Sequence, residues 1–423
     1  MPALPSRFLE PIAPRRLGTG FRWLLSSAVV VNLGDGVAIA AGPLLVASQT
    51  RDPFLVSMAL LAQFLPMLLF GVIGGVAADR FDRRRMVVAV NLVRAAVVAV
   101  LVVTIVTGNV NIALVLAILF VLGTAETFAD SASSTLLPGL VAREDLGVAN
   151  TRLQGAFLLT NQLIGPPLGA FLFTAGMALP FAANAAAFAL GALLISRVAG
   201  SVNAERRVGS SIRSDLVEGI RWLVGHPPMR TLLLTIFAFN VTYGASWAVL
   251  VLYATERLGM DEVGFGLLTT AFAIGGVIGT VSYGALERRF SLADMMRVGL
   301  LIETGTHLSL ALTTSPIVAL ATMVVFGAHA FVWWTTSTVI RQRAVPNELL
   351  GRVGGVYRVG IVGGTVLGTP IGGLLAGAYG LTAPFWFGFI GSAVLVVLLW
   401  RQFAHIAHTD EPDPAGNRLG RAS

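Results

Sequence analysis

The chain contains no cysteine and no lysine, and each absence removes whole classes of function. Without cysteine there can be no disulfide, no thiolate metal site and no cysteine nucleophile. Without lysine, no P-loop lysine can bind nucleotide phosphates and no Schiff base can hold retinal or pyridoxal phosphate. The sequence also has no HExxH zinc motif and no GxSxG serine elbow. An enzyme is therefore the class that we least expect, and we expect no cofactor and no metal.

Charge is scarce as well. Only 12% of the 423 residues are charged, whereas 55% are hydrophobic. A soluble domain of this size carries about 25% charged residues, so this chain cannot cover a globular surface with polar groups. Its exterior must face a lipid bilayer. All 29 basic residues are arginines, and they lie at the ends of apolar runs rather than in one patch. That distribution indicates membrane topology and speaks against nucleic-acid binding.

Twelve apolar segments are long enough to cross a bilayer, for which a helix needs about 20 residues. They are 23–49, 54–78, 86–107, 111–136, 147–175, 178–199, 230–255, 263–286, 293–313, 316–340, 353–377 and 381–402. The sequence therefore predicts an all-α membrane protein with twelve transmembrane helices. Arginines cluster before the first span and after every even-numbered span, whereas the alternate loops hold only Arg51 and Arg257. This asymmetry predicts a multi-pass protein of the inner or plasma membrane with both termini in the cytoplasm.

One long polar stretch, residues 200–229, separates two groups of six spans. Within it, Ile212, Leu216, Ile220 and Leu223 recur at helical spacing, which indicates an amphipathic helix at the cytoplasmic interface. The predicted division is an N-terminal six-helix bundle at 1–199, a linker at 200–229, a C-terminal six-helix bundle at 230–402 and a disordered cytoplasmic tail at 403–423.

The two groups of spans resemble each other at an offset of 203 residues. The segment "IGPPLGAFLF" in the fifth span matches "LGTPIGGLLA" in the eleventh. The matched pairs are Gly165 with Gly368, Pro167 with Pro370 and Gly169 with Gly372. A duplicated six-span unit with a substrate site near the midplane is typical of secondary transporters.

The loop after the second span carries the pattern Gly75-x-x-x-Asp79-Arg80-x-x-Arg83-Arg84. It resembles the loop motif between spans two and three of the major facilitator superfamily. The resemblance implies two pseudo-symmetric six-helix bundles. It also implies a glycine for close helix packing and a cytoplasmic charge cluster that latches the bundles together when the inside is closed. The plain alternative is that the arginines only enforce topology.

A second motif lies in the fifth span and comprises Gly165, Pro166, Pro167 and Gly169. It resembles the glycine-proline motif of the superfamily's proton-coupled antiporters, although it ends in alanine rather than glycine. Proline kinks a helix and glycine lets helices approach closely, so an ordinary kink is the alternative. The stretches "LGDG" in span one and "LLPGLV" after span four resemble the macrolide and siderophore exporter branch.

Ionisable side chains inside a span are costly and usually face a cavity or a partner. The candidates for proton coupling are Asp35, Glu126, Asp130, Glu303 and His329, and the candidate counter-ion is Arg94. Glu126 and Asp130 lie four residues apart on one helix face, so they repel each other and favour binding a proton. A fixed salt bridge or a structural hydrogen bond is the alternative for each group, and an acidic cluster can also serve sodium.

Aromatic and amide side chains accompany these acids. The candidates for lining a substrate site are Asn161, Gln162, Asn240, Tyr243, Trp247 and Trp333. Such a mixture suits a bulky amphipathic molecule, although it also suits plain helix packing. We therefore expect a monomeric, proton-coupled exporter of hydrophobic or amphipathic small molecules that works by alternating access. The alternatives are a dedicated exporter of a siderophore or another endogenous metabolite, and a non-transporting membrane sensor or scaffold.

Overall fold

The computed structural model describes residues 15–198 and 212–403, except for a few side chains inside the helices, that of Asp79 among them. Within these ranges the chain forms helices joined by short turns. The N-terminal helices are α2 (Gly18–Gln49), α3 (Pro53–Arg80), α4 (Arg83–Val106), α5 (Ile112–Leu136), α6 (Leu146–Phe157), α7 (Gly165–Ala175) and α8 (Leu179–Ser196). The C-terminal helices are α9 (Ile212–Val224), α10 (Pro227–Ala248), α11 (Leu250–Leu252), α12 (Glu262–Arg289), α13 (Leu292–Leu312), α14 (Pro316–Ala344), α15 (Leu350–Tyr379) and α16 (Ala383–Leu399).

Polar side chains fix where several of these helices begin. Asp52 accepts a hydrogen bond from the backbone N–H of Phe54 at the start of α3, and Asn111 accepts one from that of Leu114 at the start of α5. Asp261 and Ser291 cap α12 and α13 in the same way. Each cap satisfies a backbone donor that the helix leaves unpaired and contributes about 1 kcal/mol.

The predicted all-α membrane fold is confirmed. Among the described residues, ten helices are long and apolar enough to cross a membrane, and α16 is apolar but shorter. Helix α13 occupies the predicted ninth span but carries Asp294, Arg297 and Glu303. The count of twelve spans stays a prediction. Two predicted spans contain a π-helical turn, Leu158–Ile164 between α6 and α7 and Tyr253–Arg257 after α11.

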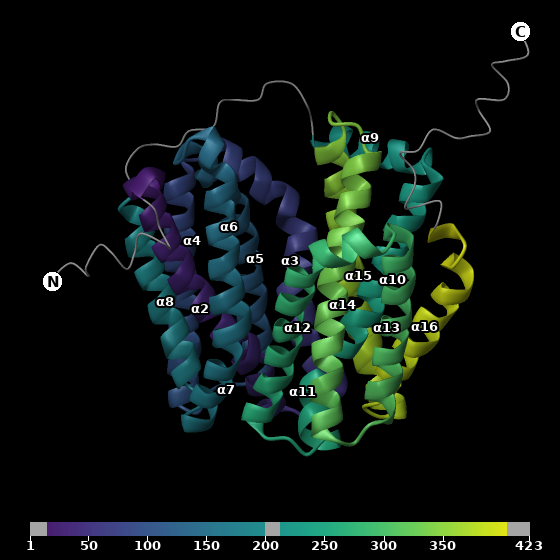
Figure 1. Ribbon diagram of the computed structural model, residues 1–423. Helices are drawn as coiled ribbons and strands as arrows, with labels where there is room; N and C mark the ends of the chain where they lie inside the picture. The colour runs from purple at the N-terminus through teal and green to yellow at the C-terminus, as the bar shows by residue number, and fades with distance from the viewer. Residues whose placement is uncertain (1–14, 199–211, 404–423) are drawn as a thin grey trace, which may run out of the picture.

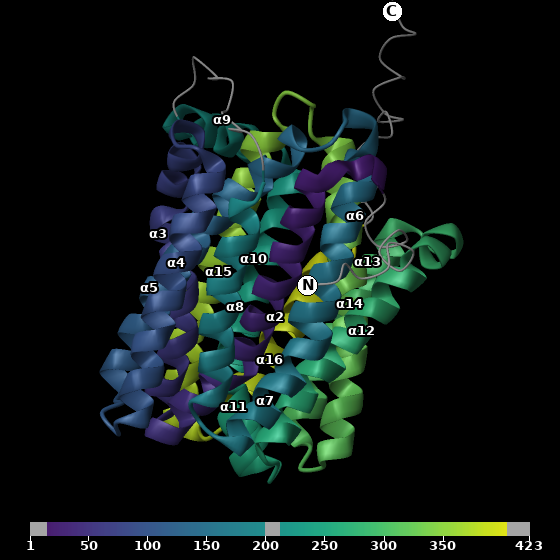
Figure 2. The same ribbon diagram turned by 90° about the vertical axis from the view of Figure 1, so that its left-hand side faces the viewer.

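The long helices run between two ends of the molecule (Figure 1; Figure 2). We call the end that carries α9 the linker end and the opposite end the far end. Helices α2 to α8 form one half and α10 to α16 form the other. The halves meet where α3 packs against α15 and α7 packs against α12.

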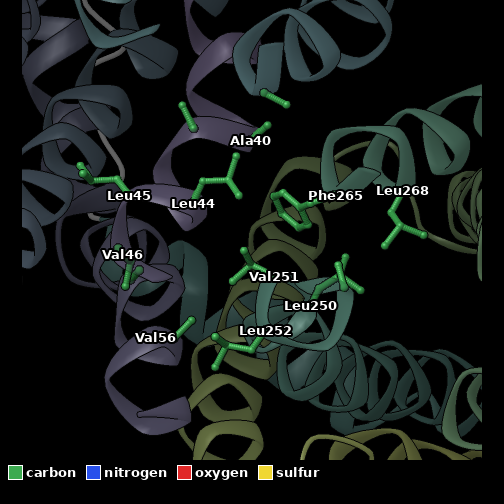
Figure 3. Packing of buried hydrophobic residues seen from close by; sticks show 14 of the residues in the cluster. Ala40, Leu44, Leu45, Val46, Val56, Leu250, Val251, Leu252, Phe265 and Leu268 are labelled. Atoms are coloured by element: carbon green, nitrogen blue, oxygen red, sulfur yellow. The ribbon is translucent and has the colours of Figure 1, made fainter. Parts of the chain in front are cut away.

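Buried apolar side chains form three clusters, and only one of them joins the halves. That cluster, the far-end closure, includes Leu44 and Val46 of α2 together with Leu250 and Phe265 from the other half. Figure 3 shows these side chains converging from both halves. The other two clusters lie at the linker end, and each draws its buried residues from one half. The halves are therefore packed together at the far end and separate at the linker end, as the ribbons in Figure 1 also show.

Small residues allow this closure. A Cβ atom added to Gly373 of α15 would lie 2.8 Å from Cα of Phe54 in α3. A Cβ atom on Gly266 of α12 would lie 2.7 Å from Cβ of Ala170 in α7. An exposed ion pair joins the halves at the same end, with Nη1 of Arg51 3.3 Å from Oε1 of Glu256.

At the linker end, ionic contacts hold each half by itself. Arg16 pairs with Asp145 in the first half, and Arg343 pairs with Glu287 in the second. Helix α9 packs against α15 and α10, so it belongs with the second half.

Two contacts fasten α9. Nη1 of Arg352 lies 2.9 Å from Oε1 of Glu218, and Leu223 is buried in the linker-end cluster of the second half. Residues 200–211 of the predicted linker and 404–423 of the predicted tail lie outside the described residues. Phe403, placed in the predicted tail, is fully buried in that same cluster.

Replacing Gly373 by valine should open the far end. The added side chain would meet the α3 backbone, and such overpacking costs about 1–3 kcal/mol. Since the chain has no native cysteine, Ala40→Cys gives a single buried thiol in the closure. We expect a membrane-impermeant maleimide, applied at the far end, to label this thiol several-fold faster in the Gly373→Val background. The control is Gly377→Val, because a Cβ there meets nothing within 4 Å. Equal labelling of the two variants would show that the closure does not depend on this contact.

Candidate functional site

An ion pair lies inside the first half. Nη2 of Arg94 on α4 is 2.8 Å from Oδ1 of Asp35 on α2. Only 5% of the arginine side chain and 21% of the aspartate side chain are exposed. The ring of Phe188 on α8 lies 4.0 Å from Cζ of Arg94, which adds a cation–π contact. Three helices therefore meet at this pair.

The turn of α2 that carries Asp35 is held closely on two sides. A Cβ atom on Gly34 would lie 2.7 Å from Cβ of Ala187 in α8, and the Asn184 side chain donates a hydrogen bond to the Gly34 carbonyl. On the other side, a Cβ atom on Gly36 would lie 2.5 Å from the carbonyl oxygen of Asn161. Any movement of this turn must therefore be shared with its neighbours.

The glycine-proline motif packs on that same turn. A Cβ atom on Gly165 would lie 2.5 Å from Cα of Gly36, and one on Gly169 would overlap the carbonyl oxygen of Val37. The motif also reaches the other half, because the carbonyl oxygen of Pro166 lies 3.3 Å from a Cβ built on Gly266 of α12. It therefore connects the helix of Asp35 to the far-end closure.

The second half repeats this packing. A Cβ atom on Gly368 would overlap the carbonyl oxygen of Val241 in α10, and one on Gly372 would overlap that of Ala245. Gly368 and Gly372 are the residues that the sequence repeat matches to Gly165 and Gly169. The duplication inferred from sequence therefore appears as the same helix contact in each half.

Two further acids lie near Asp35. Glu126 and Asp130 are both exposed on α5, and both are close enough for their charges to be felt at Asp35. The structure thus brings three of the predicted acids and the predicted counter-ion into one region of the first half.

The other two candidates, Glu303 and His329, meet in the second half. Nε2 of His329 lies 3.1 Å from Oε2 of Glu303, and Nε2 of His307 lies 3.2 Å from Oε1. All three side chains are buried. Glu303 and His307 lie four residues apart on α13, a spacing that favours their contact. The contact between Glu303 and His329 joins α13 to α14 and therefore depends on how these two helices pack.

A cavity of about 140 Å³ lies beside this cluster. Its walls are mostly apolar and aromatic. They comprise Ile236, Phe239, Asn240, Tyr243, Glu303, Phe326, His329, Ala330, Trp333, Trp334 and Ser337. A smaller cavity of about 10 Å³ lies beside His307 and Trp247.

The predicted lining residues are divided between these places. Asn240, Tyr243 and Trp333 line the larger cavity, and Trp247 lines the smaller one. Asn161 and Gln162 line neither: Asn161 donates to the carbonyl of Asn32, and Gln162 donates to Asn161.

The candidate set did not include Phe326 or Ser337, which also line the larger cavity. These residues lie on one face of α14 with His329 and Trp333, at the spacing of helical turns. The helical spacing from His329 and Trp333 was the signal by which the sequence could have indicated Phe326 and Ser337.

The charged loop motif lies at the linker end, and two of its arginines can be placed there. Arg84 donates to the carbonyl of Val198 in its own half, and Arg80 is exposed. The side chain of Asp79 lies outside the described residues. The close packing expected at Gly75 occurs at Gly74 instead: a Cβ there would lie 3.0 Å from Oγ of Ser131, whereas one on Gly75 meets nothing within 4 Å.

Replacing Arg94 by methionine should destabilise the protein strongly. The substitution leaves the Asp35 carboxylate without its partner, and breaking a buried ion pair costs about 3–5 kcal/mol. The control is Arg51→Met, which removes an exposed ion pair worth about 1 kcal/mol or less. Denaturant unfolding of the purified protein in detergent measures both. Equal losses in the two variants would contradict a buried, strongly held pair.

Replacing Gly169 by alanine should lower the thermal unfolding temperature in detergent. The new methyl group would overlap the Val37 carbonyl, so α7 must move away from α2, at a cost of about 1–3 kcal/mol. The control is Gly155→Ala on α6, since Gly155 is exposed and a Cβ there meets nothing within 4 Å. That variant should be unchanged or slightly more stable. An unaltered Gly169→Ala protein would contradict the tight contact.

Comparison with known proteins identifies the family. A family model described as "Transmembrane secretion effector" matches residues 9–417. The multidrug efflux pump Tap of Mycolicibacterium fortuitum is 30% identical over 376 residues, which cover 86% of this chain and 90% of that protein.

Solved structures share the fold. A bacterial homologue of the iron transporter ferroportin in an inward-facing state has a TM-score of 0.73 at 19% identity, covering 92% of this chain and 98% of that chain. A structure of a bacterial ferroportin homologue in an outward-facing state has a TM-score of 0.61 at 18% identity, covering 92% of this chain and 100% of that chain. The fold is that of the major facilitator superfamily, and the arrangement of the halves is more similar to the inward-facing structure.

These relatives are membrane transporters, which confirms the predicted superfamily and the prediction that the protein is not an enzyme. The assignment to a macrolide or siderophore branch stays a prediction. The chain belongs to the transmembrane secretion effector family of the major facilitator superfamily, and its role is that of a multi-pass membrane transporter in efflux.

Proposed function

We propose that the protein exports hydrophobic or amphipathic small molecules in exchange for protons, by alternating access. The observation that carries this proposal is the Arg94–Asp35 ion pair, because it lies on the turn of α2 against which the glycine-proline motif packs. A proton on Asp35 removes the charge that holds Arg94. Protonation at this point therefore acts on the packing of α7, one of the two first-half helices that meet the second half.

The proposed orientation follows from charge. The linker end carries the arginine-rich loops, so it faces the cytoplasm. The structure then represents a state open to the cytoplasm and closed at the outside. Substrate enters from the linker end in this state and leaves at the far end in the other.

The larger cavity supports the substrate class. Aromatic rings of Phe239, Tyr243 and Trp334 suit a flat apolar body, and the amide of Asn240 offers a polar contact. The exposed carboxylates of Glu126 and Asp130 in the first half favour a positive group on the substrate. The relatives named as multidrug efflux pumps agree with such a site.

The proposed cycle proceeds through the packed helices. A proton from the outside neutralises Asp35 and releases Arg94, so the turn at Gly36 can move relative to α4. That movement reaches α7 through Gly165 and then α12 through Gly266. Since packed interfaces hold discrete arrangements rather than deforming continuously, the result is a change between two states of the halves.

The loop motif belongs to the opposite state. Asp79, Arg80, Arg83 and Arg84 lie at the linker end, where the halves are separate in this structure. We propose that they latch the halves when that end closes. Exposed ion pairs are worth about 1 kcal/mol or less each, which leaves such a latch breakable.

The test is uptake of ethidium into inverted membrane vesicles whose interior is acidified. We expect Asp35→Asn to reduce the gradient-driven uptake of ethidium at least tenfold. The variant should retain exchange of ethidium down its own concentration gradient. The control is Asp52→Asn, because this residue is an exposed helix cap and asparagine caps equally well. Imposing a sodium gradient instead of a pH gradient distinguishes the two coupling ions.

The other outcomes have defined meanings. Unchanged uptake in Asp35→Asn would transfer the coupling role to Glu126, Asp130 or the Glu303–His329 pair. No uptake of ethidium or of a panel of lipophilic dyes and antibiotics by the native protein would contradict broad efflux. It would favour a dedicated exporter of an endogenous metabolite such as a siderophore, or a non-transporting sensor.

A further inference from the structure

The second half holds a buried carboxylate that has no permanently charged partner beside it among the residues that the structure describes. Glu303 is 4% exposed, and each of its two oxygens lies within hydrogen-bond distance of a different imidazole. Helices α14 and α16 pack against α13, and α16 carries no ionisable side chain. On α14 the nearest ionisable group is His329, since Arg341 and Arg343 follow it by more than three helical turns, about 18 Å along the axis.

Charge balance favours one added proton on this cluster. An ionised carboxylate only accepts hydrogen bonds, so the Nε2 atoms of His307 and His329 donate to it. With both rings neutral, the cluster carries one uncompensated negative charge in a buried site, which is costly. One added proton makes a ring cationic and the cluster neutral, and both hydrogen bonds are retained. A second proton would restore a net charge.

The two rings face different cavities. Glu303 and His329 line the cavity of about 140 Å³, which has room for several water molecules at about 30 Å³ each. His307 lines the cavity of about 10 Å³, together with Leu250, Leu310 and Phe385. These three apolar residues belong to the far-end closure. Opening the far end would remove the first-half side chains, such as Leu44 and Val46, from this cluster and bring water closer to His307.

One atom has no partner in the closed arrangement. Nδ1 of His307 is buried and accepts no hydrogen bond among the described residues, and it packs against Gly388 of α16. An unpaired buried acceptor is unfavourable, so this nitrogen is a natural position for the added proton once water reaches it. Tyr243 of α10 is the other titratable side chain at both cavities.

We propose that Glu303, His307 and His329 form a second proton site, separate from Asp35, that binds one exchangeable proton. The proton is taken up through His307 when the far end opens and is released through His329 when the linker end is open. One proton is gained and the same proton is lost, and no other bond changes. This inference deepens the proposed function, since it assigns a second group to the coupling ion.

The first experiment needs no substrate. The chain has five histidines, so ¹⁵N-histidine NMR of the full protein in lipid nanodiscs resolves few rings, and His307→Gln and His329→Gln assign the two that matter. Between about pH 8 and pH 5, where histidine titrates, we expect these rings together to gain one proton. Each of the two histidine variants should still gain one proton, on the histidine ring that remains. Glu303→Gln should reduce the imidazolium population at about pH 6 at least fivefold, because an amide does not balance the charge.

The control is His226→Gln at the linker end, where the ring stacks on Trp222 outside the cluster. It should leave both buried rings unchanged. Rings that stay neutral over the whole pH range, or that titrate equally in Glu303→Gln, would overturn the proposal. If Glu303→Gln does not fold, the two single histidine variants still decide the question, since loss of proton uptake in both would also overturn it.

A second experiment separates this inference from the proposed function. In proteoliposomes, each proton exchanged for one ethidium raises the final ratio of ethidium concentrations across the membrane about tenfold for every pH unit of the imposed gradient. Glu303→Gln should lower that gradient about tenfold; because Glu303 also lines the larger cavity, ethidium binding is followed separately by tryptophan fluorescence. An unchanged gradient would overturn a coupling role for the cluster. Proton binding by NMR in a native protein that moves no ethidium would instead contradict the proposed function and leave the site standing.

Discussion

The contact between α2 and α7 is the constraint on which much of the arrangement depends. Helices in lipid gain no hydrophobic energy by associating, so they rely on close backbone packing at small residues. Gly36, Gly165 and Gly169 supply that packing at the turn that holds Asp35. A bulkier side chain at any of these positions would separate the two helices. The ionisable group and the helix that reaches the other half are therefore parts of one rigid contact.

The apolar clusters are consistent with the proposed rocking of the halves. Two of them lie at the linker end and stabilise each half alone, so each half would keep its shape in that movement. The third joins the halves at the far end and combines small and medium side chains such as Ala40 and Val251 with aromatic rings such as Phe265 (Figure 3). No comparable cluster of described residues joins the halves at the linker end. The proposed cycle would exchange this far-end interface for one at the linker end.

The sequence predicted the features that depend on composition and on local spacing. Apolar length located the helices, and arginine placement suggested the orientation, because both follow from the cost of polar groups in lipid. The two glycine motifs were found as a repeat, and the structure shows the same packing in both halves. Arg94 was expected to accompany the acids, and it lies 2.8 Å from Asp35. The roles of these groups in transport stay predictions.

Other features depend on contacts between distant segments and could not be read from the sequence. Phe188 lies on Arg94 although 94 residues separate them. The larger cavity is formed mainly by one face of α14 and by α10, whereas Asn161 and Gln162 turn towards α2 and each other. Nor does a sequence show which state the halves adopt. The loop motif has its residues at the linker end, and the proposed latch would form only when that end closes.

The third long helix of each half carries a buried ionisable side chain, and the two side chains have opposite charge. Arg94 is the twelfth residue of α4, and Glu303 is the twelfth residue of α13. In the first half a fixed cation neutralises an aspartate, so the pair is neutral when no proton is bound. In the second half a carboxylate meets two imidazoles, so the cluster is neutral only when a proton is bound. A proton on Asp35 thus leaves Arg94 facing the carboxylates of Glu126 and Asp130, whereas the proton on the Glu303 cluster removes its one uncompensated negative charge. Under the proposed function, a transfer of protons between outside and inside therefore acts on an ion pair in one half and on an uncompensated carboxylate in the other.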